Sequence, residues 1–263
     1  MFLFYATTFT YNGVSCKDFD LTLCASDKGL MKNDNAIGSV NYVTDKTSSM
    51  NYNYLLGAQQ NDVLEFEITM MTNLEKDREW VGQVMNWLTG YNEYKKLTFD
   101  QPDMEGIYFN CIVEDVKLVT VGNMPKGFTC KIKCDRGYAL EEEKVYTYNI
   151  SSSPHTFTHT NTSHGHGVTL PVVEVTTSSS NATVSIVNAS NNNWETKLTG
   201  LTSNEVITMD SQHEIIKSSN GVRRLANFNN HWFELVEGDN RITVTGNVSK
   251  IVIRYKNNRK VGV

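Results

Sequence analysis

The stretch WFELVEGDNRITVTGN, Trp232 to Asn247, bears most directly on the fold. An apolar run reaches Gly238-Asp239-Asn240, and a segment of alternating apolar and polar residues follows. Such alternation is typical of a half-buried strand. We expect Gly238 to allow a backbone conformation that a Cβ would oppose, and Asn240 to hydrogen-bond nearby main chain. The stretch therefore predicts a tight turn between two strands, with Phe233 in the core.

The same pattern runs through the whole second half of the chain. Short segments rich in Val, Ile and Thr alternate with polar turn residues roughly every 8–12 residues, which indicates an all-β sandwich. We place this sandwich at residues 168–263. The preceding residues 146–167, which include SSSPHTFTHTNTSHGHG, are polar and predict a linker after an N-terminal domain at residues 1–145.

The N-terminal half predicts a mainly β domain. Asn12-Gly13 is a strong hairpin signal, and DVLEFEITMM places Leu64, Phe66, Ile68 and Met70 on one face of a strand. Residues 26–48 are polar and predict a long loop or an extended arm. Residues 123–127 predict the turn between the last two strands.

One helix is expected. Thr72 to Glu75 fits a capping box, apolar residues then recur at helical spacing, and Gly90 is placed to end the helix. Its tryptophans, Trp80 and Trp87, suit either a sugar platform or anchors that hold the helix on the sheet, and we favour the anchors.

Composition narrows the possible functions. The chain has 263 residues, 40 % of them apolar, and this length suits two domains. Its formal charge of −5 argues against a protein that wraps nucleic acid. The basic segment Arg254 to Lys260 is read as a solvated tail or an interface. Five cysteines without a Cys-x-x-Cys favour reduced thiols. We expect neither a signal peptide nor a membrane span.

No catalytic motif is found. Nucleophile-elbow, phosphate-loop and metalloprotease patterns are missing, and the neighbours Glu114 and Asp115 would point to opposite faces of a strand. We therefore expect a protein that is not an enzyme and has no cofactor. A β-sandwich hydrolase with a carboxylate pair stays as a lesser alternative.

Two ligand sites remain open. Four histidines cluster in the expected linker: His155, His159, His164 and His166. They suit either a metal site built from imidazoles or a polar loop, and we expect the polar loop. Trp194, with His231 and Trp232, suits either stacking on a sugar ring or burial.

Read together, the motifs resemble a known family. LTSNEVITMDSQHEIIKSSNG (201–221), then NFNNHWFELVEGDNRITVTG (227–246), is similar to the end of the siphophage distal tail protein, Dit. Three further segments are similar to its N-terminal domain: the early Asn12-Gly13-Val14-Ser15, the helix ending in VMNWLTG, and KKLTFDQPDMEGIYFNCIVEDV. The segment Ser151 to Gly167 matches no family pattern.

The resemblance implies a fold and a function. It implies an N-terminal β-domain with one helix that forms a hexameric ring around a DNA channel, and a C-terminal galectin-like sandwich. It places the ring, single or as two stacked rings, at the distal end of the tail in the virion, after assembly in the cytoplasm of the bacterial host. The implied partners are the major tail tube protein and tail-associated, fibre or receptor-binding proteins, while DNA passes without specific binding.

The arm from Ser26 to Gly57 suggests how subunits meet. It carries Tyr42, Tyr52 and Tyr54, and an unpaired strand seeks an edge on a neighbour, so we expect these tyrosines at an oligomer interface. The alternative function is a carbohydrate-binding module that aids adsorption to the host cell wall, with Trp194 as a glycan contact.

Overall fold

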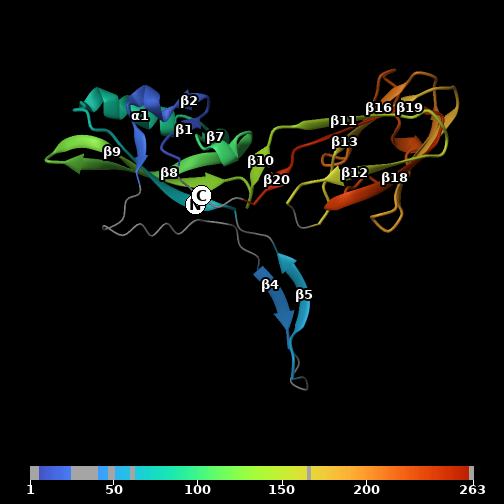
Figure 1. Ribbon diagram of the computed structural model, residues 1–263, viewed down its shortest axis with the longest axis horizontal. Coiled ribbons are helices and arrows are strands. Elements are labelled where there is room, and N and C mark those ends of the chain that lie inside the picture. Colours follow the sequence, from blue (N-terminus) through green and yellow to red (C-terminus); the bar gives the residue numbers. More distant parts are fainter. Residues whose placement is uncertain (1–5, 25–40, 47–50, 60–62, 165–166, 261–263) are drawn as a thin grey trace. The chain divides into compact units, whose positions relative to one another are not determined.

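The computed structural model describes residues 6–24, 41–46, 51–59, 63–164 and 167–260. The chain forms two compact units, and each has its own core. Unit 1 comprises Met1–Glu141 and Arg259–Val263, and unit 2 comprises Glu142–Asn258. The protein is thus mainly β with two units, as predicted, and the second unit is inserted near the end of the first (Figure 1).

Unit 1 is built on one mostly antiparallel sheet, ordered β2-β1-β7-β8-β9-β6-β3, to which β10 and β20 are added. The strands are β1 (Phe9–Tyr11), β2 (Val14–Ser15), β3 (Thr22–Cys24), β6 (Glu65–Met71), β7 (Lys95–Phe99), β8 (Ile107–Val121), β9 (Met124–Cys134), β10 (Ala139–Glu141) and β20 (Asn258–Arg259). Short 3₁₀ turns lie at Cys16–Phe19 and Pro102–Met104. A separate two-stranded sheet pairs β4 (Asn41–Asp45) with β5 (Tyr54–Gln59).

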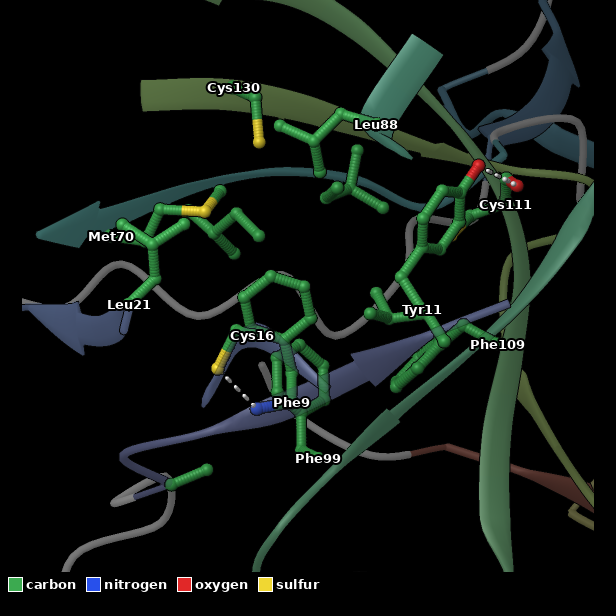
Figure 2. Packing of buried hydrophobic residues seen from close by; sticks show 14 of the residues in the cluster. Phe9, Tyr11, Cys16, Leu21, Met70, Leu88, Phe99, Phe109, Cys111 and Cys130 are labelled. Atoms are coloured by element: carbon green, nitrogen blue, oxygen red, sulfur yellow. Dashed lines mark hydrogen bonds between the residues drawn. The ribbon is translucent and has the colours of Figure 1, made fainter. Parts of the chain in front are cut away.

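The one α-helix among the described residues, α1 (Arg78–Thr89), packs its apolar face on this sheet. Trp87 stacks on Phe9 with ring centroids 5.6 Å apart, and its indole N–H donates to the Tyr11 carbonyl over 3.1 Å. The Trp80 indole N–H donates to the Phe19 carbonyl. Both tryptophans therefore anchor the helix. Figure 2 shows the core beneath it, including buried Cys16, Cys111 and Cys130, which are free thiols, as are Cys24 and Cys134.

The helix begins later than the capping-box pattern predicted. Its N-cap is Asp77, whose side chain accepts from the Trp80 N–H over 2.9 Å. Thr72 instead directly follows β6, where its N–H donates to the Lys126 carbonyl and its hydroxyl accepts from the Leu74 N–H. Gly90 is the C-cap, as predicted, and its N–H donates to the Asn86 carbonyl.

Two hairpin turns are formed by residues that tolerate a positive φ. Asn12-Gly13 joins β1 and β2, with φ of 50° and 77°. The turn between β8 and β9 is Gly122-Asn123, with φ of 56° and 65°, rather than residues 123–127. A primed turn matches the twist of a hairpin, so the Gly-Asn pair decides the register here.

Unit 2 is a β-sandwich with its core between two antiparallel sheets. One sheet has the order β11-β19-β13-β16-β17 and the other β12-β18-β14-β15. The strands are β11 (Lys144–Asn149), β12 (His155–Asn161), β13 (Val172–Thr177), β14 (Ala182–Asn188), β15 (Trp194–Leu201), β16 (Val206–Asp210), β17 (Ile215–Ser218), β18 (Gly238–Gly246) and β19 (Val248–Tyr255), with a 3₁₀ turn at Leu225–Asn227.

Two strands occupy the segment that the sequence suggested as a linker. β11 pairs with β19, and β12 pairs with β18 along its whole length. The polar composition hid an alternating pattern in which Phe157, His159 and Asn161 turn inward. The structure therefore divides the chain at Glu142, and residues 146–149 and 155–161 of the expected linker belong to the two sheets of the sandwich.

The stretch 232–247 also differs from its prediction. Gly238 to Asn240 is the start of β18, not a turn. Of residues 232–237, which precede β18, only Leu235 forms a β-bridge, and its partner is Thr169. Gly238 does adopt a positive φ of 82°. Asn240 is fully buried and donates to the carbonyls of Val236 and Gly238, so its side chain holds the corner through local main chain.

Candidate functional site

The arm is the most exposed apolar part of the described chain. Tyr52 and Tyr54 are 58 % and 43 % exposed, and their rings meet edge to face with hydroxyl oxygens 3.1 Å apart. Leu55 and Leu56 are 64 % and 65 % exposed. Tyr42 pairs with Ala58 across the hairpin. Large apolar side chains that are exposed together are typical of contact surfaces. The two leucines were not singled out from the sequence.

A second open feature is the outer edge of β8. On that side β7 pairs with it only as far as Cys111, whereas β9 follows the other edge to Val121. From Ile112 to Val121, no described strand pairs with the outer edge. Leu118, Val121 and Met124 are 44 %, 58 % and 46 % exposed. Such an edge is a template for strand addition by another chain.

Sequence reasoning missed this edge. It depends on the unequal lengths of paired strands, since β7 has 5 residues and β8 has 15. The sequence signal that could have revealed the edge is the length of the strand pattern in IYFNCIVEDVKLVTV, which continues beyond the residues that the shorter β7 can pair. Between Glu114 and Lys117 a bulge interrupts the register, and Asp115 there has φ of 50°. Glu114 and Asp115 are therefore part of a bulge, not a carboxylate pair with a shared target.

The open face of the unit 1 sheet carries paired charges. Glu65 bridges Lys131 at 2.5 Å and Lys133 at 3.7 Å. These side chains alternate with Phe66 and Ile132, which belong to the core side. The hydrogen bond from Lys131 is the main cause that lowers the Glu65 pKa. A cation already paired with a carboxylate has less attraction for phosphate.

Trp194 lies outside the sandwich core, at the start of β15. Its indole N–H donates to the Trp232 carbonyl over 2.7 Å, and its ring stacks on His231 with centroids 4.5 Å apart. Trp232 instead packs against the core, and Phe233 is fully buried in it. The three aromatic residues named from the sequence are thus close together, but only two of them form an outward-facing stack.

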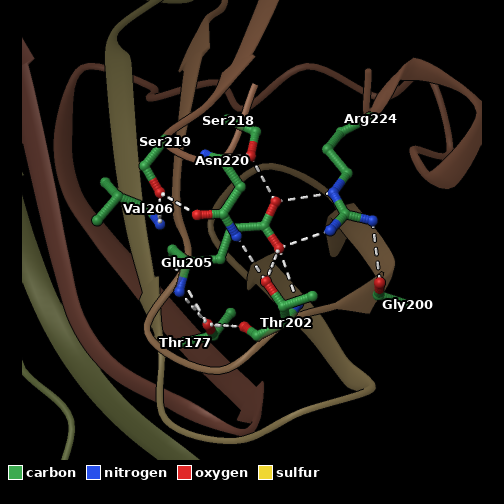
Figure 3. A network of polar contacts seen from close by, with 9 residues as sticks. All are labelled: Thr177, Gly200, Thr202, Glu205, Val206, Ser218, Ser219, Asn220 and Arg224. Atoms are coloured by element: carbon green, nitrogen blue, oxygen red, sulfur yellow. Dashed lines mark hydrogen bonds and ion pairs between the residues drawn. The ribbon is translucent and has the colours of Figure 1, made fainter. Parts of the chain in front are cut away.

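A buried ion pair fixes one end of the sandwich (Figure 3). Glu205 is fully buried and accepts from Arg224 at 2.8 and 2.6 Å, from Ser218 at 2.6 Å and from Thr202. Burial opposes ionisation of Glu205, but these hydrogen bonds outweigh it and lower its pKa to about 2. Every oxygen of the carboxylate is used internally, so the network is structural.

The described histidines of the expected linker, His155, His159 and His164, form no metal site together. His159 is buried between the hydroxyls of Tyr148 and Tyr255, at 2.7 and 2.9 Å, and burial lowers its pKa to about 4. His155 contacts Phe157 on the same strand. His166 lies outside the described residues. No group of three or more His, Cys, Asp or Glu that could hold a metal ion occurs among the residues described.

Within the described chain, no helix has the length and apolar character needed to cross a bilayer. The only α-helix there has 12 residues.

Comparison with known proteins gives a family. Residues 4–136 match the model of a phage tail protein N-terminal domain, and residues 138–255 match the model of a phage tail C-terminal domain. The junction between the two matches lies close to Glu142, where the structure divides. A search of curated proteins found no match.

A solved structure has the same fold. It is described as the crystal structure of SPP1 Dit (gp 19.1) protein, a paradigm of hub adsorption apparatus in Gram-positive-infecting phages. The match has a TM-score of 0.69 at 15 % identity and covers 95 % of this chain and 98 % of that chain. The likeness extends over both units.

Proposed function

Because the chain belongs to the phage tail protein family whose N- and C-terminal domain models it matches in succession, we propose that it is a structural hub at the distal end of a long phage tail. The proposed assembly is a hexameric ring, single or as two stacked rings. It would join the tail tube protein to tail-associated or receptor-binding proteins, after assembly in the host cytoplasm. The fold shared with SPP1 Dit supports this proposal.

The observation that carries the proposal is the pair of open features on unit 1. A ring needs two different surfaces on each subunit, one of which binds the other on the next copy. The unpaired edge of β8 offers main-chain hydrogen bonds, and the arm offers exposed apolar area at Leu55 and Leu56.

Passage of DNA through the ring fits the charge pattern. The chain has a formal charge of −5, and Lys131 and Lys133 on the open face of the unit 1 sheet pair with Glu65. Cations that are already paired with a carboxylate add little to counterion release, so these two lysines would hold DNA weakly. A structural role of this kind needs no catalytic group or cofactor.

The test is the mass of the full-length protein by light scattering after size exclusion, with negative-stain images of the peak. We expect hexamers, or pairs of hexamers, with a central hole. The double variant Leu55→Ser/Leu56→Ser and the edge variant Leu118→Lys should each shift the protein towards monomer. Leu74→Ser is the matched control, since Leu74 is 52 % exposed outside both surfaces. Monomeric wild-type protein, or variants that assemble like wild type, would contradict the proposal.

A further inference from the structure

The stack of Trp194 and His231 is a rigid aromatic surface that the sandwich does not need for its core. The apolar cluster of unit 2 includes Phe228 and Phe233, with Trp232 packed against it, but neither Trp194 nor His231. A tryptophan usually contributes stability by burying its large apolar surface. Here a second ring covers one face of the indole while His231 itself remains exposed.

Hydrogen bonds hold this surface in place from three segments. The Trp194 N–H donates to the Trp232 carbonyl, which ties β15 to the segment before β18. Asn229 accepts from the main-chain N–H groups of Lys197 and His231, and its amide donates to the Glu195 carbonyl over 2.8 Å. The stack is thus fixed without a ligand, and a preorganised surface loses little entropy when it binds one.

The rim is rich in amides. Asn191 donates to the Glu234 carboxylate over 2.8 Å, which holds the turn between β14 and β15 beside the stack. Asn192 and Asn193 in that turn are exposed, and so is Asn230 next to His231. Side-chain amides both donate and accept, as sugar hydroxyls require. Aromatic faces complement the apolar C–H face of a pyranose ring.

We propose that the Trp194–His231 stack and its asparagine rim form a binding site for a neutral saccharide, such as a pyranose unit of a host-surface glycan. The amide rim favours a saccharide over an apolar peptide, because an apolar partner would leave these amides without hydrogen bonds. The site uses residues of unit 2 alone. It therefore does not depend on ring formation.

The test is calorimetric titration of the full-length protein with soluble trisaccharides of glucose, galactose, N-acetylglucosamine and rhamnose. Indole N–H signals in NMR spectra are recorded in parallel and assigned with Trp194→Phe. We expect at least one trisaccharide to bind at millimolar concentration or below and to shift the Trp194 signal. His231→Ala and Trp194→Ala should each weaken binding by about tenfold or more. His213→Ala, at an exposed histidine in another turn, should leave binding unchanged.

Three outcomes would overturn the proposal: no binding across the panel, binding that does not shift the Trp194 signal, or binding that survives His231→Ala. His231 makes no side-chain hydrogen bond in the structure described, so His231→Ala remains informative if Trp194→Ala fails to fold. Light scattering on the same samples separates this result from the hub proposal. A ring that does not bind sugar would refute only the site, and a sugar-binding monomer would refute only the hub.

Discussion

At the scale of single residues, the Asn240 side chain forms main-chain hydrogen bonds that a paired strand would otherwise supply. Its carbonyl oxygen accepts from the Val236 N–H at 2.9 Å and from the Asn188 amide at 2.8 Å, and its own amide donates to two carbonyls. We predict that Asn240→Ala lowers the free energy of unfolding by about 2–4 kcal/mol, because buried partners lose their hydrogen bonds. Denaturant titration measures this. Asp239→Ala, at the exposed neighbour, should change it by less than about 1 kcal/mol.

His159 makes stability depend on pH in a defined window. Its pKa is about 4 in the folded protein and 6.5 when unperturbed, so the unfolded chain binds the proton more readily between these values. The stabilisation is complete above pH 6.5 and is lost as the pH falls to 4, by about 3 kcal/mol in total. Denaturant titrations across this range should show a shallower loss in His159→Gln. Equal slopes in both proteins would rule out the assignment.

At the scale of elements, two glycines of β18 separate backbone strain from close approach. Gly238 and Gly246 both have positive φ, of 82° and 113°. A Cβ on Gly238 would meet nothing within 4 Å, whereas one on Gly246 would lie 1.8 Å from the Thr183 carbonyl oxygen. We predict that Gly238→Ala costs about 1 kcal/mol and Gly246→Ala several times more, since β14 must move. Thermal unfolding of both variants compares them, and equal losses would count against the close contact.

The elements also show where sequence patterns succeed and fail. Alternation identified β6, and the apolar spacing identified α1, because burial of one face dominates both. The helix start predicted from the capping box at Thr72 was wrong, because the Thr72 N–H donates to the Lys126 carbonyl instead. The strand expected after Trp232 did not form, since Asn188 and Asn240 bind the main chain of Glu234 and Val236 instead. Local motifs fail where another group, such as the Lys126 carbonyl or the Asn188 amide, takes the main-chain hydrogen bond.

At the scale of the whole molecule, the two separate cores predict two unfolding transitions. Glu205→Gln leaves Arg224 without its full partner in a buried site, which should cost unit 2 about 3–5 kcal/mol. Calorimetry should therefore show one transition moved to lower temperature and the other unchanged. Glu174→Gln is the control, because its ion pair with Arg254 is about 30 % exposed and should matter little. A single transition that moves as a whole would contradict independent cores.

The candidate surfaces could be predicted only in part from the sequence. The arm could be placed because a long polar segment interrupts the strand pattern, and Trp194 because asparagines precede it. The β8 edge depends on which strands pair and how far, which one chain's pattern does not state. The same holds for the proximity of His231 to Trp194, since these residues are brought together by the pairing of β14, β15 and β18.

The sandwich begins after Glu141 and ends before Arg259, and β10 and β20, which carry these two residues, pair with each other. Its entry and exit are therefore neighbours. In genetic terms, recombination could replace the sandwich with another domain whose ends lie close together and leave the scaffold of the first unit intact. Phage lineages could thus exchange the second unit while they keep the first.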